Sequence, residues 1–260
     1  MKNVIVAAHP ASVFTRWFHV WMAGVCCLVA FVGFAPTYWM QLAPGTFVGS
    51  PLLHLHAFLF SAWTLYFVAQ TILAARGQVG RHRAWGLLGV SLSTAMVFVG
   101  VTAANDALSR RLAAGLGDAA RALHIVPISL MVFFGLLVLA AVATVTRPEI
   151  HKRLMVLATV AVMPPAVARI LYVVNVGGVA PGARPGLGPL RTVESVMTST
   201  LIADALILAG VVHDVYTRGR PHPVYVVGGI AMVAVQVLRA PASTTQWWYA
   251  IADFLARFNG

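Results

Sequence analysis

The sequence predicts an all-α integral membrane protein, and three observations carry this prediction. Of the 260 residues, 60% are hydrophobic and only 10% are charged, whereas an ordinary soluble domain has about 25% charged residues. The mean hydropathy is +0.84. Seven apolar stretches are each long enough for a membrane-spanning helix, which needs about 20 residues. This composition excludes a soluble enzyme, a disordered chain and a disulfide scaffold.

The seven predicted spans form a single domain over residues 1–240. We place them at residues 17–38, 52–75, 84–104, 124–146, 154–176, 193–216 and 223–240. The first is too long for the core of a signal peptide and is therefore predicted to be retained. The connection at 177–191 is rich in Gly and Pro, which predicts an irregular loop.

Residues 241–260 are predicted to form a separate amphipathic tail. Trp247, Ile251, Phe254 and Phe258 recur at helical spacing, whereas Asp253 falls outside this stripe. Such a pattern favours a short helix that lies in the membrane interface. Neighbouring tryptophans are typical of the aromatic belt at that depth.

The positive charge indicates an orientation. The net charge is +11, and Lys and Arg concentrate in three very short loops on one side of the predicted topology. Positive loops mark the cytoplasmic side. We therefore predict a bacterial inner-membrane protein with a cytoplasmic N-terminus and a periplasmic C-terminus. The expected partners are the lipid bilayer with its anionic headgroups and other membrane proteins, and not nucleic acid.

The three short loops resemble one another, which predicts an internal repeat. Each leads through basic residues to a histidine, and a small residue follows seven positions later: His82 with Gly89, His151 with Ala158, and His222 with Gly229. The predicted architecture is one leading helix plus three related hairpins. Two interpretations stay open: these histidines mark helix ends at the headgroups, or they converge at the inner face to bind a metal, a haem edge or an anionic headgroup.

A second group of histidines is predicted at the outer face. His54 and His56 open the second span, and His124 opens the fourth at a similar depth. One histidine from each of two helices can ligate a haem iron or a metal, so the cofactor stays unknown, with haem b and a transition metal as the candidates. The alternative is that they hydrogen-bond to headgroups or loops.

Two ionisable residues lie deep within predicted spans. Arg169 is in the fifth and Asp204 is in the sixth, and consecutive spans are usually neighbours. An ion pair between them would remove two charges from hydrocarbon. Pro164 and Pro165 lie one turn earlier and are expected to kink the fifth span. The pair indicates either a polar cavity or a contact that only fixes helix packing.

Four segments resemble a family of uncharacterised bacterial polytopic membrane proteins, described as a domain of unknown function. They are residues 56–70, 82–89, 151–159 and 214–223, of which HisLysArgLeuMet at 151–155 is the most specific. The resemblance implies a bacterial inner membrane and carries no activity.

Three functional hypotheses follow from these residues. The first is a haem- or metal-binding redox protein that uses the histidines at both faces. The second is a transporter or small-molecule receptor with a cavity around Arg169 and Asp204. The third is a non-catalytic accessory subunit of a larger membrane complex. The chain has no Gly-rich phosphate loop, GxSxG, HExxH or CxxC motif, so no enzyme class is indicated.

Overall fold

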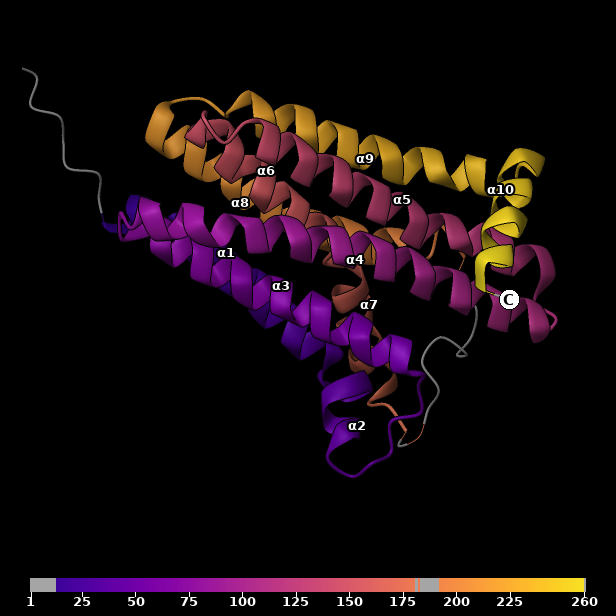
Figure 1. Cartoon of the computed structure of the whole chain (residues 1–260). Helices are drawn as coiled ribbons and strands as arrows, with labels where there is room; N and C mark the ends of the chain where they lie inside the picture. Colours follow the sequence, from indigo (N-terminus) through magenta and orange to yellow (C-terminus); the bar gives the residue numbers. More distant parts are fainter. Residues whose placement is uncertain (1–12, 181, 183–191, 260) are drawn as a thin grey trace, which may run out of the picture.

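The computed structural model describes residues 13–180, 182 and 192–259, and this part of the chain folds into helices without a strand. Figure 1 shows the bundle. The helices are α1 (Val13–Phe34), α2 (Met40–Leu42), α3 (Pro51–Ala75), α4 (Val79–Ala113), α5 (Gly117–Ala143), α6 (Pro148–Ala161), α7 (Pro164–Val176), α8 (Met197–Arg218), α9 (Pro223–Ser243) and α10 (Gln246–Ala256), with a π-helical turn at Ala35–Trp39 and a 3₁₀ turn at Arg257–Asn259. The all-α prediction is confirmed.

Length and composition allow six helical segments to cross a membrane. They are Trp17–Leu42, α3, α4, α5, α8 and α9. A seventh crossing is possible if α6 and α7, which meet at a 40° bend, form one broken span. The bend falls at Pro164 and Pro165, which have no backbone N–H to continue the hydrogen-bond ladder. The predicted kink in this span is confirmed. Of the predicted irregular connection, residues 181 and 183–191 lie outside the described part.

The helix α6 is the centre of the bundle. It packs against α1, α5, α8 and α9, and every residue from Val156 to Met163 is buried. One polar side chain within this run, Thr159, is fully buried and accepts a hydrogen bond from the indole Nε1 of Trp63 on α3 at 3.3 Å. A helix that is apolar on all sides is expected in a protein core or in lipid, and the burial of this run shows that other helices surround it.

Small residues allow close helix crossings. A Cβ on Gly33 of α1 would lie 2.5 Å from the backbone oxygen of Ala166 on α7, so the two backbones touch there. Of the small residues in the predicted repeat, Gly89 lies against the ring of Tyr66 and Ala158 is fully buried in α6. A Cβ on Gly229 would meet Ile207 at an ordinary 3.8 Å. The three positions therefore differ in how tightly they pack.

The connection between the third and fourth predicted spans is largely helical. The helix α4 continues to Ala113 and α5 begins at Gly117, whereas the predicted spans end at residue 104 and begin at 124. Hydropathy underestimates these helices because their outer turns are rich in Ala and carry ion pairs one turn apart, which favour a helix. These pairs join Asp106 to Arg110 and Asp118 to Arg121.

The tail helix α10 packs on the ends of α4 and α5 (Figure 1). Trp248 is buried and its Nε1 donates to the backbone oxygen of Arg121 at 2.8 Å. The guanidinium of Arg121 also pairs with Asp253 at 2.7 Å. The opposite side exposes a large apolar surface, formed by Trp247, Ile251, Phe254 and Phe258. The tail therefore has one face against the bundle and one apolar face exposed.

The close crossing of α1 and α7 gives a stability prediction. Gly33→Ala should destabilise the protein by about 1–3 kcal/mol, because the new methyl group would meet the backbone of Ala166. Gly24→Ala on the same helix is the matched control, since nothing lies within 4 Å of its Cβ position. It should be neutral or stabilising by up to about 1 kcal/mol. Thermal unfolding in detergent measures both. Equal changes in stability for Gly33→Ala and Gly24→Ala would show that the backbones of α1 and α7 do not touch at Gly33.

Candidate functional site

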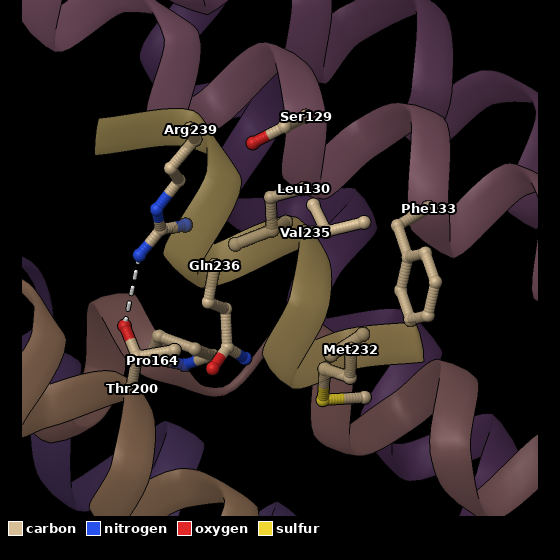
Figure 2. Close-up of a pocket in the computed structure, with 10 residues that line it drawn as sticks. Ser129, Leu130, Phe133, Pro164, Thr200, Met232, Val235, Gln236 and Arg239 are labelled. Carbon is tan, nitrogen blue, oxygen red and sulfur yellow. Dashed lines mark hydrogen bonds between the residues drawn. The ribbon is translucent and has the colours of Figure 1, made fainter. Parts of the chain in front are cut away.

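Four polar residues of α8 and α9 form what we call the polar centre: Thr200, Asp204, Gln236 and Arg239. Thr200 and Asp204 are four residues apart on α8, and Gln236 and Arg239 are three apart on α9, so each pair shares one helix face. The two helices pack against each other. The Arg239 Nη2 donates to the hydroxyl of Thr200 at 3.2 Å (Figure 2).

The polar centre is buried and incompletely paired. The side chains of Gln236 and Arg239 are only 5% and 6% exposed. Both carboxylate oxygens of Asp204, the Oε1 of Gln236 and the Nε of Arg239 are buried without a hydrogen-bond partner within the described protein. The Gln236 amide and the charge of Arg239 nevertheless both interact with the Asp204 carboxylate. Buried polar atoms are normally paired. The oxygens of Asp204 and Gln236 can therefore accept a hydrogen bond, and the Arg239 Nε–H can donate one, to a water molecule or a ligand.

Three of the four residues of the polar centre line a small cavity at the break between α6 and α7. Thr200, Gln236 and Arg239 line it together with Ala161 and Pro164, the residues at which α6 ends and α7 begins (Figure 2). Its volume is about 20 Å³, enough for about one water molecule. The α-helical donor to the Ala161 carbonyl would be residue 165, which is a proline. A polar cavity beside a broken helix is the usual substrate site in secondary transporters.

The structure does not pair Arg169 with Asp204. No described ion pair joins them. The Arg169 Nη1 donates to the Pro165 carbonyl at 2.9 Å, and its guanidinium lies 4.3 Å from the ring centroid of Phe34 on α1. Asp204 faces α9 instead. The two helices α7 and α8 are neighbours, but hydropathy does not fix their rotation.

Sequence reasoning missed Arg239 as a functional candidate. It lies near the predicted outer end of the last span, where an arginine is expected to contact headgroups. The signal that could have identified it is the spacing of Gln236 and Arg239, which places two polar side chains on one face of an otherwise apolar helix.

The three predicted outer histidines have separate protein partners. The Nδ1 of His54 is 3.0 Å from the hydroxyl of Tyr38, and the ring of His56 stacks on Phe60 at 4.1 Å. His124 is buried two turns inside α5, with its Nε2 3.0 Å from the Asn105 oxygen on α4. Within the described residues, no three His, Cys, Asp or Glu side chains are grouped to hold a metal. The longer α4 and α5 explain why His124 is not at a helix end.

Two of the three predicted inner histidines meet. The rings of His82 and His151 are 6.2 Å apart, and the Nδ1 of His151 lies 2.8 Å from the Ala141 carbonyl. His222 has a different role, since it caps α9 by accepting a hydrogen bond at Nδ1 from the Val224 N–H. Burial and the charges of Arg153 and Arg218 lower the pKa of His222. A lowered pKa favours the neutral form that can accept this bond.

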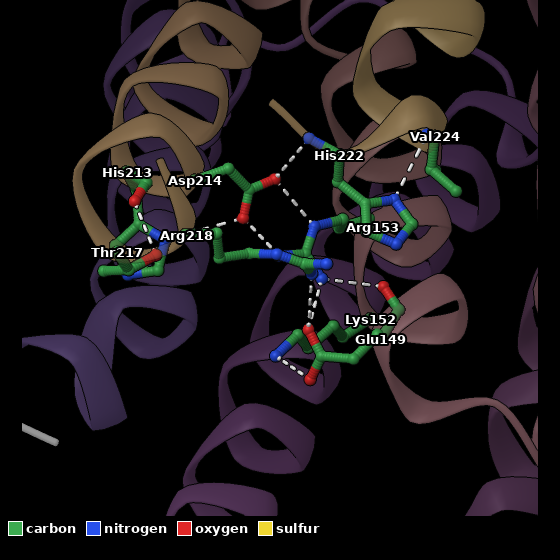
Figure 3. A network of polar contacts seen from close by, with 9 residues as sticks. All are labelled: Glu149, Lys152, Arg153, His213, Asp214, Thr217, Arg218, His222 and Val224. Atoms are coloured by element: carbon green, nitrogen blue, oxygen red, sulfur yellow. Dashed lines mark hydrogen bonds and ion pairs between the residues drawn. The ribbon is translucent and has the colours of Figure 1, made fainter. Parts of the chain in front are cut away.

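A second polar cluster, which we call the inner clamp, joins the starts of α6 and α9 to the end of α8 (Figure 3). Arg153 and Asp214 are 2% and 0% exposed and form a bidentate ion pair, with the Arg153 Nε donating to Asp214 Oδ2 at 2.8 Å. Arg153 also donates to the backbone oxygen and the carboxylate of Glu149, at 2.8 and 2.7 Å. Asp214 accepts a further bond from the His222 N–H at 3.3 Å.

The inner clamp is fully paired, which distinguishes it from the polar centre. The Glu149 carboxylate also binds Lys152 at 2.6 Å and Arg218 at 3.3 Å. An Arg with a carboxylate on each side and a backbone acceptor has little capacity left for a ligand. The inner clamp therefore has the properties of a structural site.

Disrupting the inner clamp should cost far more stability than removing its exposed member. Asp214→Asn and Arg153→Gln should each destabilise the fold by about 3–5 kcal/mol, because each leaves a buried charge unpaired. Lys152→Gln is the control, since its pair with Glu149 is partly exposed and should contribute at most about 1 kcal/mol. Chemical unfolding in mixed micelles measures these differences. A loss below 1 kcal/mol for Asp214→Asn would contradict the buried pair.

Comparison with known proteins adds no family. No family model matches the chain, and neither a curated protein nor a solved structure is similar to it. The resemblance to an uncharacterised bacterial membrane family therefore stays a prediction, and the chain stands as a polytopic helical protein with apolar helices of membrane-spanning length.

Proposed function

We propose that the chain is a membrane transport protein whose substrate site is the polar centre beside the break between α6 and α7. The observation that carries the proposal is the incomplete pairing of Asp204 and Arg239 inside the bundle. Ionisable groups are costly in a membrane and are retained mainly where they act on a substrate, an ion or a proton. The inner clamp shows that this chain pairs a buried arginine fully when stability alone is at stake.

The chemistry of the polar centre suits a substrate that carries an oxygen acceptor. Arg239 offers a free Nε–H beside the Thr200 hydroxyl. Asp204 can exist as a carboxylate that balances Arg239 or as a neutral acid, so a proton can accompany the substrate. The break next to Pro164 supports a hinge, because the two halves of this span do not share a continuous hydrogen-bond ladder.

The proposal includes the predicted membrane topology. The charged short loops support a cytoplasmic N-terminus in a bacterial inner membrane. The exposed apolar side of the tail supports contact with the outer interface of the bilayer, because the aromatic side chains of Trp247, Phe254 and Phe258 are all exposed there. The three hairpins are α3 with α4, α5 with α6–α7, and α8 with α9. Their origin as repeats is part of the proposal.

The test is charge movement in proteoliposomes on a solid-supported membrane. The panel comprises amino acids, short-chain carboxylic acids, sugars and long-chain fatty acids. At least one compound should evoke a current with the wild-type protein. Asp204→Asn and Arg239→Gln should each reduce it about tenfold or more, the factor expected for losing a hydrogen bond to a charged group. Asp106→Asn, in a half-exposed pair of α4, should leave the current unchanged.

Two outcomes would contradict the transport proposal. The first is a current that survives both Asp204→Asn and Arg239→Gln in folded protein. The second is a chain that responds to no compound and co-purifies with a larger membrane complex in mild detergent, as the accessory-subunit hypothesis requires. Size-exclusion profiles of each variant identify those that do not fold.

The metal-binding hypothesis is a second candidate because of His82 and His151. The Nδ1 of His151 bonds a backbone carbonyl, the arrangement that orients the other ring nitrogen toward a metal. Purified protein should then carry a transition metal, or a haem with a visible absorption band, which His82→Ala and His151→Ala remove. His54→Ala is the control. Retention of the same metal content by both variants would exclude this pair as the site.

A further inference from the structure

An apolar groove lies on the lipid-facing side of α5, α6 and α9. Its volume is about 390 Å³, within the range of ligand sites, about 300–1,000 Å³. The residues that line it include Leu137 of α5, Leu154 of α6, and Val227 and Ala231 of α9. Val227 is 66% exposed, so the groove opens toward the surrounding lipid. A groove of this composition fits a hydrocarbon chain and offers nothing to a polar solute.

The groove and the polar cavity are separate but neighbouring along α9. Phe133 of α5 lines both. On α9 the groove includes residues up to Ala231, and the cavity begins at Met232 and reaches Arg239. Val227 and Arg239 are twelve residues apart, which is about 18 Å along a helix. One elongated molecule can therefore occupy both, with its polar end at Arg239.

We propose that the ligand of this site is a single-chain amphiphile with a small oxygen head, of the fatty-acid class. Its carboxylate binds Arg239 and Thr200, and its chain lies in the apolar groove. The planar guanidinium matches a carboxylate, and the Arg239 Nε is free within the described protein. The cavity of about 20 Å³ is far too small for the phosphodiester of a two-chain lipid. A single groove likewise accommodates one chain.

Asp204 does not line the cavity, but it lies one turn from Thr200 on α8 and its charge acts on Arg239. Its two carboxylate oxygens make no direct hydrogen bond of normal geometry in the described protein, and Gln236 and Arg239 interact with them. When the acid enters in its neutral form, its proton transfers to Asp204 and the resulting carboxylate pairs with Arg239. One proton and one negative charge are thereby accommodated together, and the total charge of the site is unchanged. This inference uses the same site as the proposed function but requires binding only, not transport.

The experiment is photolabelling of the full chain in nanodiscs with palmitate that carries a diazirine in its chain. Peptide mapping should place the label on the groove-lining parts of α5, α6 and α9, and unlabelled palmitate should compete. Val227→Trp, which fills the groove, should lower labelling about tenfold, as for the loss of one strong contact. Val226→Trp is the matched control, because Val226 is also exposed but does not line the groove.

The head contact is tested in the same assay. Arg239→Gln should lower labelling about tenfold, whereas Arg239→Lys should restore part of it because the charge is kept. A diazirine phosphatidylcholine probe should label the lipid-facing helices of the wild-type protein and of all these variants to the same extent. Equal labelling of Val226→Trp and Val227→Trp, no competition by palmitate, or the same pattern with phosphatidylcholine would each overturn the proposal.

The two proposals fail in different ways. Groove labelling that depends on Arg239, combined with no current for any compound, would reject transport and retain the amphiphile site. A current that depends on Asp204, combined with no specific labelling, would retain transport and reject the amphiphile.

Discussion

The buried ion pair of Arg153 and Asp214 is the interaction on which the rest of the bundle depends. It lies at the start of α6, the helix that four other helices surround, and it ties that helix to the end of α8 and the start of α9. Two charges withdrawn from water stabilise a fold only when their geometry is near ideal and their remaining groups are bonded. Here the guanidinium binds Asp214 with two nitrogens and Glu149 with the third, which satisfies that condition. The rotation of α6, and with it the position of the break at Pro164, follows from this contact.

The two polar clusters of the bundle differ in how completely their polar atoms are paired. The inner clamp bonds all three guanidinium nitrogens of Arg153 and both carboxylate oxygens of Asp214, so it fixes three helix ends in one geometry. The polar centre places Asp204 and Arg239 on adjacent helices but leaves several of their atoms unbonded. The low dielectric of the protein interior increases this difference. It makes a hydrogen bond stronger, and it makes a buried polar group without a hydrogen bond more costly. The unpaired polar atoms lie beside a broken helix. The side chains there can therefore change their hydrogen-bond partners.

Much of the fold follows from composition, whereas little of the site does. Apolar runs located the spans, and Pro164 with Pro165 located the bend, because both depend on local chemistry. The outer turns of α4 and α5 were missed since a hydropathy scale does not register Ala-rich helix with ion pairs. Which arginine acts on Asp204 depends on how α7, α8 and α9 rotate, which only packing decides. The sequence predicts Arg169, whereas in the structure the charge that acts on Asp204 is that of Arg239. The inner histidines also show that spacing along the chain does not determine contacts in the fold. His82, His151 and His222 are spaced almost equally, but only the rings of His82 and His151 lie near each other.

The length of α4 has a consequence for how the protein meets its surroundings. Its 35 residues extend about 52 Å, whereas the hydrocarbon core is about 30 Å thick. Even with an ordinary tilt, the last turns must stand among headgroups and water, and there they join the start of α5 and the buried face of α10. These helix ends are held together by the contacts of Trp248 and Arg121 and not by lipid. The protein can therefore keep one conformation in membranes of different thickness. Only the depth at which the bilayer surface meets α4, α5 and α10 would change.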